Sequence, residues 1–137
     1  MAVAMLLVAV TIGACGGGSG AGDVCDAAAH DAAAIVAWGT DYRSGKLSVT
    51  DLRDKLDGAA TRWQTTASGT TDNLMRLLAS RMHQQLQVTQ FAAVHNVPGG
   101  DDYSSSDGPG LVVQPGEWTG GDLGYDYRQA CGRDLPK

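Results

Sequence analysis

Three histidines, His30, His83 and His95, are the side chains best suited to hold a transition metal. No two of them form an H-x-x-x-H pair, and Cys25 stands five residues before His30, which is not a usual zinc spacing. Asp26 and His30 lie one helical turn apart, which a surface ion pair explains. The sequence therefore predicts no metal centre and no bound cofactor.

The densest group of oxygen ligands is DDYSSSDG, at residues 101–108. An EF-hand calcium loop starting at Asp102 would need Gly where Asp107 stands and a bidentate Glu where Val113 stands. The register that starts at Asp101 also fails, and nothing positions the adjacent aspartates as a general acid and base. This segment could bind a divalent cation weakly or form a solvated polar loop, and the sequence favours the loop.

The motifs of the common enzyme classes do not occur in this sequence. Ser19 stands in GGSGA, which lacks the second Gly of a nucleophile elbow and follows no expected strand. A phosphate-binding loop and a dinucleotide fingerprint are also missing from the sequence. We predict no catalytic residue and a non-enzymatic protein; because catalytic groups need only converge in space, an enzyme stays among the alternatives.

Tryptophan and tyrosine side chains could line a groove for a sugar or a peptide. Trp38 and Trp63 fall on the inner faces of expected helices, so core packing is favoured for them. Trp118, Tyr125 and Tyr127 stand in a Gly-rich segment, where aromatic side chains suit either a recognition surface or the plugging of a small core. These three residues are the candidate recognition surface of the protein.

Length and charge narrow the class of protein further. A chain of 137 residues suggests a single domain. Its 10 Lys and Arg against 15 Asp and Glu leave a net charge of -5, so nucleic acid is not an expected partner because its phosphates would be repelled. Every one of these charged residues follows position 22, which sets the first 22 residues apart.

The beginning of the chain has the pattern of an export leader. Residues 2–14, AVAMLLVAVTIGA, are thirteen apolar or small residues without a charge, whereas a permanent span needs roughly 20. No Lys or Arg precedes this run, as it would in most signal peptides. The four residues from Ile12 to Cys15, IGAC, resemble the lipobox of bacterial lipoproteins. The other interpretation is an ordinary secretory signal, or an unprocessed apolar tail, with Cys15 present by chance.

The lipobox resemblance implies a topology for the whole chain. Residues 1–14 would be a lipoprotein signal peptide, cut before Cys15, and the thiol of Cys15 would carry a diacylglyceryl group. Residues 15–22 would then be the lipidated Cys and a flexible tether, because GGGSGAG is a typical Gly/Ser linker. The resemblance therefore places the protein on the cell membrane, lipid-anchored at its extracytoplasmic face, with the membrane as one partner.

Lipid on Cys15 leaves an even pair of thiols, Cys25 and Cys131. Disulfides persist outside the cytoplasm, and chain-entropy models give about 4.7 kcal/mol for closing a loop of this length. Two free buried thiols or a redox pair are the alternatives, but the chain contains no C-x-x-C. We expect a structural disulfide that ties the start of the folded domain to its end.

Residues 23–97 have the apolar periodicity of helices. The first expected helix, 23–45, begins at an aspartate cap and ends at a glycine; the second, 48–69, begins with the capping box SVTD. The third, 70–97, begins after a threonine pair that can cap it and ends before Pro98. Its expected inner side chains are Leu74, Leu77 or Leu78, Met82, Leu86 and Phe91. Three amphipathic helices with short connections predict an all-α fold, a small three-helix antiparallel bundle.

Residues 98–137 form a Gly/Pro-rich C-terminal extension, for which we expect loops. Residues 111–113, LVV, could form a short strand, and the aromatic residues would pack the extension on the bundle before the disulfide closes it. Large aliphatic side chains are scarce, so Ala, Met, Trp and Tyr must supply much of the core.

These features together predict a membrane-anchored cell-envelope lipoprotein that acts as a non-enzymatic binding or assembly module on an envelope protein partner. The alternative function is a lipoprotein that binds a small molecule or a metal ion and serves a transporter or sensor. A bound ligand would raise the melting temperature of the protein, whereas an assembly module would co-purify with its partner.

Overall fold

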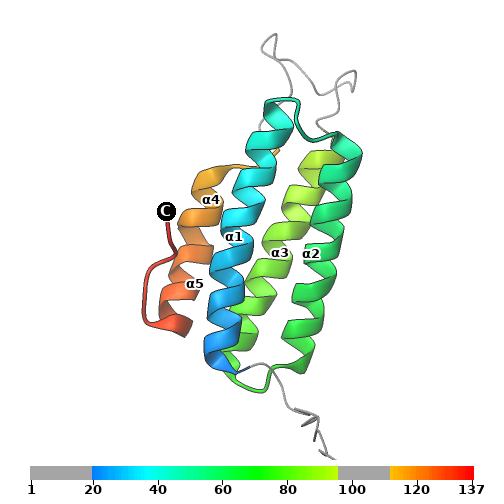
Figure 1. Ribbon diagram of the computed structural model, residues 1–137. Helices are drawn as coiled ribbons and strands as arrows, with labels where there is room; N and C mark the ends of the chain where they lie inside the picture. The colour runs from blue at the N-terminus through cyan, green and yellow to red at the C-terminus, as the bar shows by residue number, and fades with distance from the viewer. Residues whose placement is uncertain (1–19, 96–111) are drawn as a thin grey trace, which may run out of the picture.

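Three long helices run antiparallel to one another and form the body of the molecule (Figure 1). The structure, a computed structural model, describes residues 20–95 and 112–137. Within these ranges the helices are α1 (Ala21–Arg43), α2 (Val49–Gly69), α3 (Asn73–His95), α4 (Pro115–Thr119) and α5 (Gly121–Cys131). The part of the chain that is described contains no strand. The all-α fold and the three-helix antiparallel bundle are therefore confirmed.

The ends of α2 and α3 follow local side-chain chemistry. The expected aspartate cap of the first helix is wrong, because α1 begins at Ala21 after Gly20 and Asp23 lies within its first turn. The Asp51 amide donates to Ser48 Oγ at 3.0 Å, which is the capping contact expected at the start of α2. Gly45 has φ of 75°, a left-handed conformation that suits glycine just after the end of α1. The cap of α3 differs from the expectation, because Asp72 Oδ1, not a threonine, accepts from the amides of Leu74 and Met75 at 3.0 Å. A carboxylate near a helix N-terminus also interacts favourably with the helix dipole.

The core lies between all three long helices and the C-terminal extension. Its largest fully buried side chains are Val24, Ile35, Leu52, Leu56, Leu78, Met82, Leu86, Trp118, Leu123 and Tyr127. Small residues such as Ala28, Ala59 and Ala79 are fully buried as well, so they let the helices approach closely. The extension thus supplies two of the largest core side chains, which compensates for the scarcity of aliphatic residues in the bundle.

The expectation that the extension consists of loops is wrong for residues 115–131. Pro115 occupies the first turn of α4, where its missing N–H costs nothing, and α5 ends at Gly132, which has φ of 67°. Helix α5 packs against α1 and α3, and α4 packs against α1 and α5. The glycines of this segment have weak intrinsic helix propensity, and the sequence pattern reflects only that propensity. Burial of Trp118 and Tyr127 against the bundle outweighs it.

The short strand expected at residues 111–113 does not form at Val112 and Val113, which are bends with buried side chains; Leu111 lies outside the described residues. Val113 packs directly on the backbone of α1 at Gly39. A Cβ on Gly39 would stand 2.5 Å from Val113 Cβ, so the close approach requires glycine at this position.

The disulfide between Cys25 and Cys131 is present, with the two Cα atoms 5.9 Å apart. It joins the first turns of α1 to the last residue of α5 across 106 positions of sequence. The expected closure of the C-terminal extension by a disulfide is therefore confirmed.

The inner face of α3 differs from the expected one. Leu78, Met82 and Leu86 are fully buried, but Leu74, Leu77 and Phe91 point outward. The buried residues of α3 also include Met75, Ala79, Thr89 and Ala93. The small side chains of Ala79 and Ala93 allow close helix packing, and the Thr89 hydroxyl donates to the Gln85 carbonyl at 2.9 Å.

Candidate functional site

The proposed recognition trio is divided between the core and the surface. Trp118 and Tyr127 are completely buried, whereas Tyr125 is 63% exposed. The prediction of a recognition surface made by all three residues is therefore wrong, because two of them fill the core that the bundle leaves incomplete. The Tyr127 hydroxyl accepts from Arg133 Nε at 3.1 Å, while Trp118 Nε1 is buried without a hydrogen-bond partner.

The two tryptophans of the bundle occupy different environments. Trp63 is 2% exposed, as expected for a core residue. Trp38 is half-buried and packs at the edge of the core, with the Lys55 ammonium 5.3 Å from its ring centroid. A cation over an aromatic face stabilises such a site by about 0.5–1 kcal/mol. Both rings therefore contribute to the bundle itself.

The three histidines lie apart and hold structural contacts. His83 Nδ1 lies 3.0 Å from the Ala60 carbonyl and His95 Nδ1 lies 2.8 Å from the Phe91 carbonyl. His95 also stacks on the Phe91 ring at 3.8 Å between centroids. In residues 20–95 and 112–137 no group of three His, Cys, Asp or Glu side chains could hold a metal ion. The acidic segment 101–108 lies outside the described residues.

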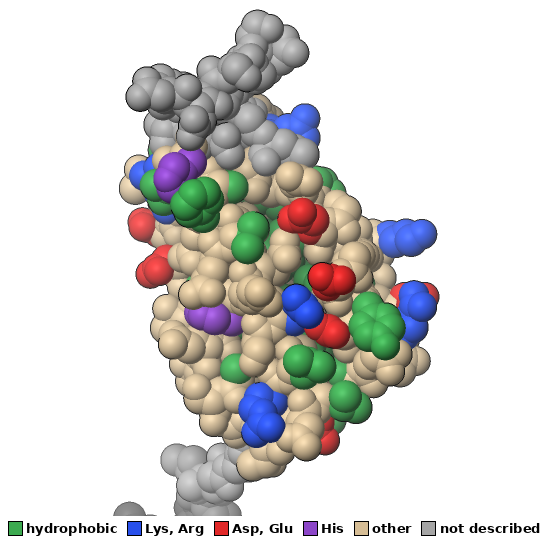
Figure 2. Space-filling model, turned by 180° about the vertical axis from the view of Figure 1, so that it is seen from behind, with side chains coloured by type: hydrophobic (Ala, Val, Ile, Leu, Met, Phe, Trp, Pro, Cys, Tyr) green, Lys and Arg blue, Asp and Glu red, His purple; other side chains and the backbone are tan. Residues whose placement is uncertain are grey.

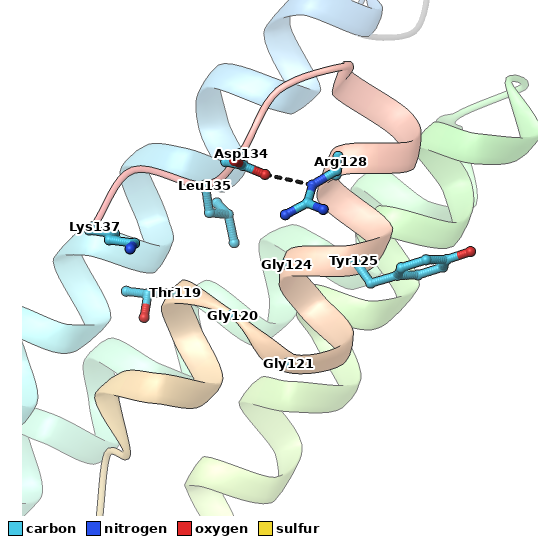
Figure 3. A pocket seen from close by; sticks show the side chains of 9 residues that line it. All are labelled: Thr119, Gly120, Gly121, Gly124, Tyr125, Arg128, Asp134, Leu135 and Lys137. Atoms are coloured by element: carbon cyan, nitrogen blue, oxygen red, sulfur yellow. Dashed lines mark hydrogen bonds and ion pairs between the residues drawn. The ribbon is translucent and has the colours of Figure 1, made fainter.

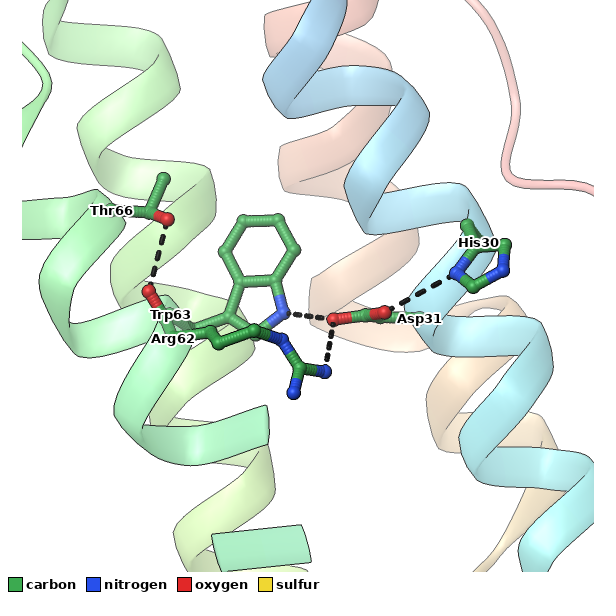
Figure 4. A network of polar contacts seen from close by, with 5 residues as sticks. All are labelled: His30, Asp31, Arg62, Trp63 and Thr66. Atoms are coloured by element: carbon green, nitrogen blue, oxygen red, sulfur yellow. Dashed lines mark hydrogen bonds and ion pairs between the residues drawn. The ribbon is translucent and has the colours of Figure 1, made fainter. Parts of the chain in front are cut away.

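A network of polar contacts joins α1 to α2 around Asp31 (Figure 4). Asp31 Oδ2 accepts from Trp63 Nε1 at 2.9 Å and from Arg62 Nη2 at 3.2 Å, and its Oδ1 lies 3.4 Å from His30 Nδ1. The Asp31 side chain is only 14% exposed. Trp63 and Arg62 of α2 both donate to one oxygen of a carboxylate on α1, so this network braces the two helices.

One open pocket lies between α5 and the C-terminal residues (Figure 3). It has a volume of about 390 Å³ and is lined by Thr119, Gly120, Gly121, Gly124, Tyr125, Arg128, Asp134, Leu135 and Lys137. Arg128 is paired with Asp134 at 2.6 Å, and both side chains are well exposed. The pocket thus offers an anion no desolvated cation, and affinity for a small ligand would be weak.

Another pocket, of about 370 Å³, adjoins the disulfide at the start of α1. Its lining includes Cys25, Cys131 and Met75, and Met75 Sδ lies 3.9 Å from Cys25 Sγ. Arg133 Nη2 donates to Asp26 Oδ1 at 2.5 Å across its mouth. These contacts hold the C-terminal residues against α1. We therefore assign the residues of this pocket a structural role.

The most distinctive surface feature is an apolar stripe on the outer face of α3. We define the α3 stripe as Leu74, Leu77, Val88 and Phe91, each about half exposed or more. Their positions follow the alternating spacing of three and four residues, and Arg81, Gln84 and His95 occupy the remaining positions of that series. This spacing places all seven side chains on one face of the helix. Over 21 residues the face extends roughly 31 Å along the helix axis.

The centre of the α3 stripe is polar. Arg81 Nε donates to Asp126 Oδ2 on α5 at 2.7 Å, and Arg81 Nη1 donates to Gln84 Oε1 at 3.2 Å. The hydrogen bond to Asp126 and the charges of Asp126 and Asp122 raise the pKa of the Arg81 guanidinium above its usual value, against the opposing effect of desolvation. The cation inside the stripe is thus already neutralised by its own chain.

Acidic side chains lie along both edges of the α3 stripe. On the α4–α5 edge are Asp122, Asp126 and Glu117, which accepts from Gln85 Nε2 at 2.8 Å. On the α2 edge, Asp57 Oδ1 accepts from Gln90 at 3.4 Å. Figure 2 shows apolar side chains near both ends of this side of the molecule, with acidic side chains between and beside them. The surface thus combines an apolar strip with a negatively charged margin on the α4–α5 side, whereas on the α2 side Arg53, bonded to the Ala93 carbonyl, balances Asp57.

Sequence reasoning missed the α3 stripe, although a signal for it was present. The apolar positions of α3 form two series, one through Leu78, Met82 and Leu86 and one through Leu77 and Phe91. A single helix cannot turn both series inward, so one had to face the solvent.

No known protein family matches the chain, and neither the curated proteins nor the solved structures include a detectable relative. None of the described helices combines the length and the apolar character that a membrane crossing would require.

Proposed function

We propose that this protein is a lipid-anchored lipoprotein of the cell envelope whose helical bundle binds a protein partner on the extracytoplasmic face of the membrane, without catalysing a reaction. The single observation that carries the proposal is the IGAC sequence ending at Cys15, followed by a short Gly/Ser segment that leads into an exposed helix start at Ala21. A diacylglyceryl group provides two chains, which is what stable anchoring requires.

The cysteine pairing supports this proposal. Cys25 and Cys131 are bonded to each other, which leaves Cys15 as the one thiol of the sequence for lipid attachment. A structural disulfide in a small domain is typical of an oxidising compartment outside the cytoplasm.

The surface supports binding rather than catalysis. The pocket beside α5 and the pocket at the disulfide are lined by exposed or already paired charges, and the Asp31 carboxylate accepts hydrogen bonds from Trp63 and Arg62. The α3 stripe, in contrast, exposes apolar side chains in a row along one helix, and such a surface is typical of a protein contact.

The test is the intact mass of the protein from membranes of its native host, measured with and without reduction. We expect a chain that begins at Cys15, carries a diacylglyceryl group and gains the mass of two hydrogen atoms when its disulfide is reduced. A Cys15→Ala variant should be lost from the membrane fraction, with Ser19→Ala as the matched control that stays there. An unprocessed chain, or a Cys15→Ala variant that is retained in the membrane, would refute the anchoring.

A lipoprotein that binds a small molecule or a metal ion for a transporter or sensor is distinguished from this proposal by a thermal shift. A ligand panel that includes anions and divalent cations should leave the melting temperature unchanged if the protein is a binding partner of another protein. A saturable rise in melting temperature with one of these ligands would favour the alternative.

A further inference from the structure

The apolar side chains of the α3 stripe are exposed to water, so a partner that covered them would be stabilised by their burial. Phe91 is 65% exposed and Val88 is 55% exposed, while the opposite face of the same helix is fully buried. Residues spaced alternately by three and four positions form the ridge on which a second helix packs. The shape of the surface therefore suits a helix lying along α3.

The charges beside the α3 stripe decide what kind of helix fits. Glu117, Asp122 and Asp126 lie along one edge and Asp57 lies along the other. Arg81, the one cation inside the stripe, is already bonded to Asp126. On the α2 edge Arg53, which donates to the Ala93 and Val94 carbonyls of α3, balances the charge of Asp57, so the net negative charge lies on the α4–α5 edge. A helix covering the stripe would bring one row of its flanking residues against that edge, and Lys or Arg at those positions would be favoured.

The same charges argue against two other occupants. A second copy of this chain, packed stripe to stripe about a two-fold axis with antiparallel α3 helices, would place the acidic α4–α5 edge against itself. With parallel helices that edge would face the α2 edge, where Arg53 is already bonded to its own chain. An anionic lipid surface would also be repelled by the acidic α4–α5 edge. Charge complementarity therefore selects a cationic partner.

We propose that the α3 stripe is the docking surface for a basic amphipathic helix of a partner protein. This inference rests on the proposed function as a binding module and names the chemistry of the partner. Apolar side chains of the partner helix cover Leu74, Leu77, Val88 and Phe91, and its Lys or Arg side chains meet the acidic α4–α5 edge. Asp126 and Gln84 keep Arg81 in place beneath it.

The test uses two synthetic three-heptad peptides with Leu at the a and d positions. The basic probe has Lys at e and g, and the acidic probe has Glu there. Binding of each fluorescent peptide to the full chain in nonionic detergent micelles is measured by anisotropy, with empty micelles as the blank. We expect the basic probe to bind about tenfold more tightly than the acidic probe.

Variants assign the binding to this surface. Leu77→Ser with Phe91→Ser should weaken the basic probe about tenfold, because two exposed apolar contacts are lost while the core is untouched. Asp122→Lys should weaken it about fivefold, and Asp41→Lys on α1 is the matched charge control that should leave it unchanged. Circular dichroism checks that each variant keeps its helices.

Three results would overturn the inference. If the two probes bound equally well, charge would not contribute to the recognition. If the double serine variant bound the basic probe as tightly as the wild type, the α3 stripe would not be the binding site. Sedimentation that shows a dimer of the wild type, lost in the double serine variant, would show that a second copy covers the stripe. Each of these results is independent of membrane anchoring, which the Cys15→Ala variant tests separately.

Discussion

The contact between Gly39 and Val113 provides the sharpest test of how the C-terminal extension is held. In Gly39→Ala the new Cβ would lie 2.5 Å from Val113 Cβ and 2.9 Å from Val113 Cγ2. Ordinary carbon contacts lie at roughly 3.5–4.0 Å, so Val113 or α1 must move by about 1 Å or more. Val112 and Val113 are both nearly fully buried, so the movement exposes apolar area or strains the packing.

The expected magnitude follows from two opposing effects. Overpacking of a core position costs about 1–3 kcal/mol, while replacing Gly by Ala inside a helix stabilises it by about 0.5–1 kcal/mol. We expect a net loss of about 1–2 kcal/mol in the free energy of unfolding. Gly58→Ala in α2 is the matched control, because a Cβ at this position would lie 3.8 Å from its nearest neighbour, Arg62 Nη1. The Gly58→Ala variant should gain about 0.5–1 kcal/mol in the free energy of unfolding.

The assay is urea unfolding followed by circular dichroism at the helix band. Adding Val113→Ala to Gly39→Ala should recover part of the loss, because the double variant removes the atoms that clash, and a double-mutant cycle gives the coupling. If Gly39→Ala proved as stable as Gly58→Ala, or if the cycle showed no coupling, the packing of Val113 on α1 would be refuted.

Three further predictions concern stability. The double variant Cys25→Ser, Cys131→Ser should have a free energy of unfolding about 2–5 kcal/mol lower, measured by urea unfolding. The wild type under reducing conditions should match this variant. A loss below about 1 kcal/mol would contradict a stabilising role of the disulfide. Trp63→Phe removes an indole N–H that donates to Asp31, whereas Trp118→Phe removes an indole N–H without a partner. Trp63→Phe should therefore lower the free energy of unfolding by about 1–2 kcal/mol more than Trp118→Phe does. Equal losses would argue against the hydrogen bond to Asp31. Asp126→Asn weakens the bond to Arg81 and should lower the melting temperature, with a loss of about 1–3 kcal/mol, whereas Asp134→Asn, in an exposed pair with Arg128, should change little; similar effects of the two would show that burial does not strengthen the Arg81 pair.

For α3, the local sequence pattern predicts the helix correctly but not which of its faces is buried. Periodicity predicted that the segment is a helix, and the structure confirms a helix from Asn73 to His95. It placed Leu74 and Phe91 inside, and they are exposed, while of Leu77 and Leu78 only Leu78 is buried. The choice between two apolar series depends on which residues meet α2 and α5, and that information lies in other segments of the chain.

The sequence by itself determined the features that short-range chemistry controls. The capping box at Ser48, the glycine after α1 and the apolar period of residues 23–95 specify the three long helices, because caps and periodicity act within a few residues. The disulfide followed from counting thiols once Cys15 had been set apart by the lipobox resemblance.

Only the tertiary structure decided how the extension is used. Residues 115–131 have weak helix propensity, yet they are helical because Trp118, Leu123 and Tyr127 become buried against helices far away in the sequence. The same burial removed Trp118 and Tyr127 from the surface and left the outer face of α3 exposed. Burial is a property of the assembled molecule, so no local pattern of residues can report it.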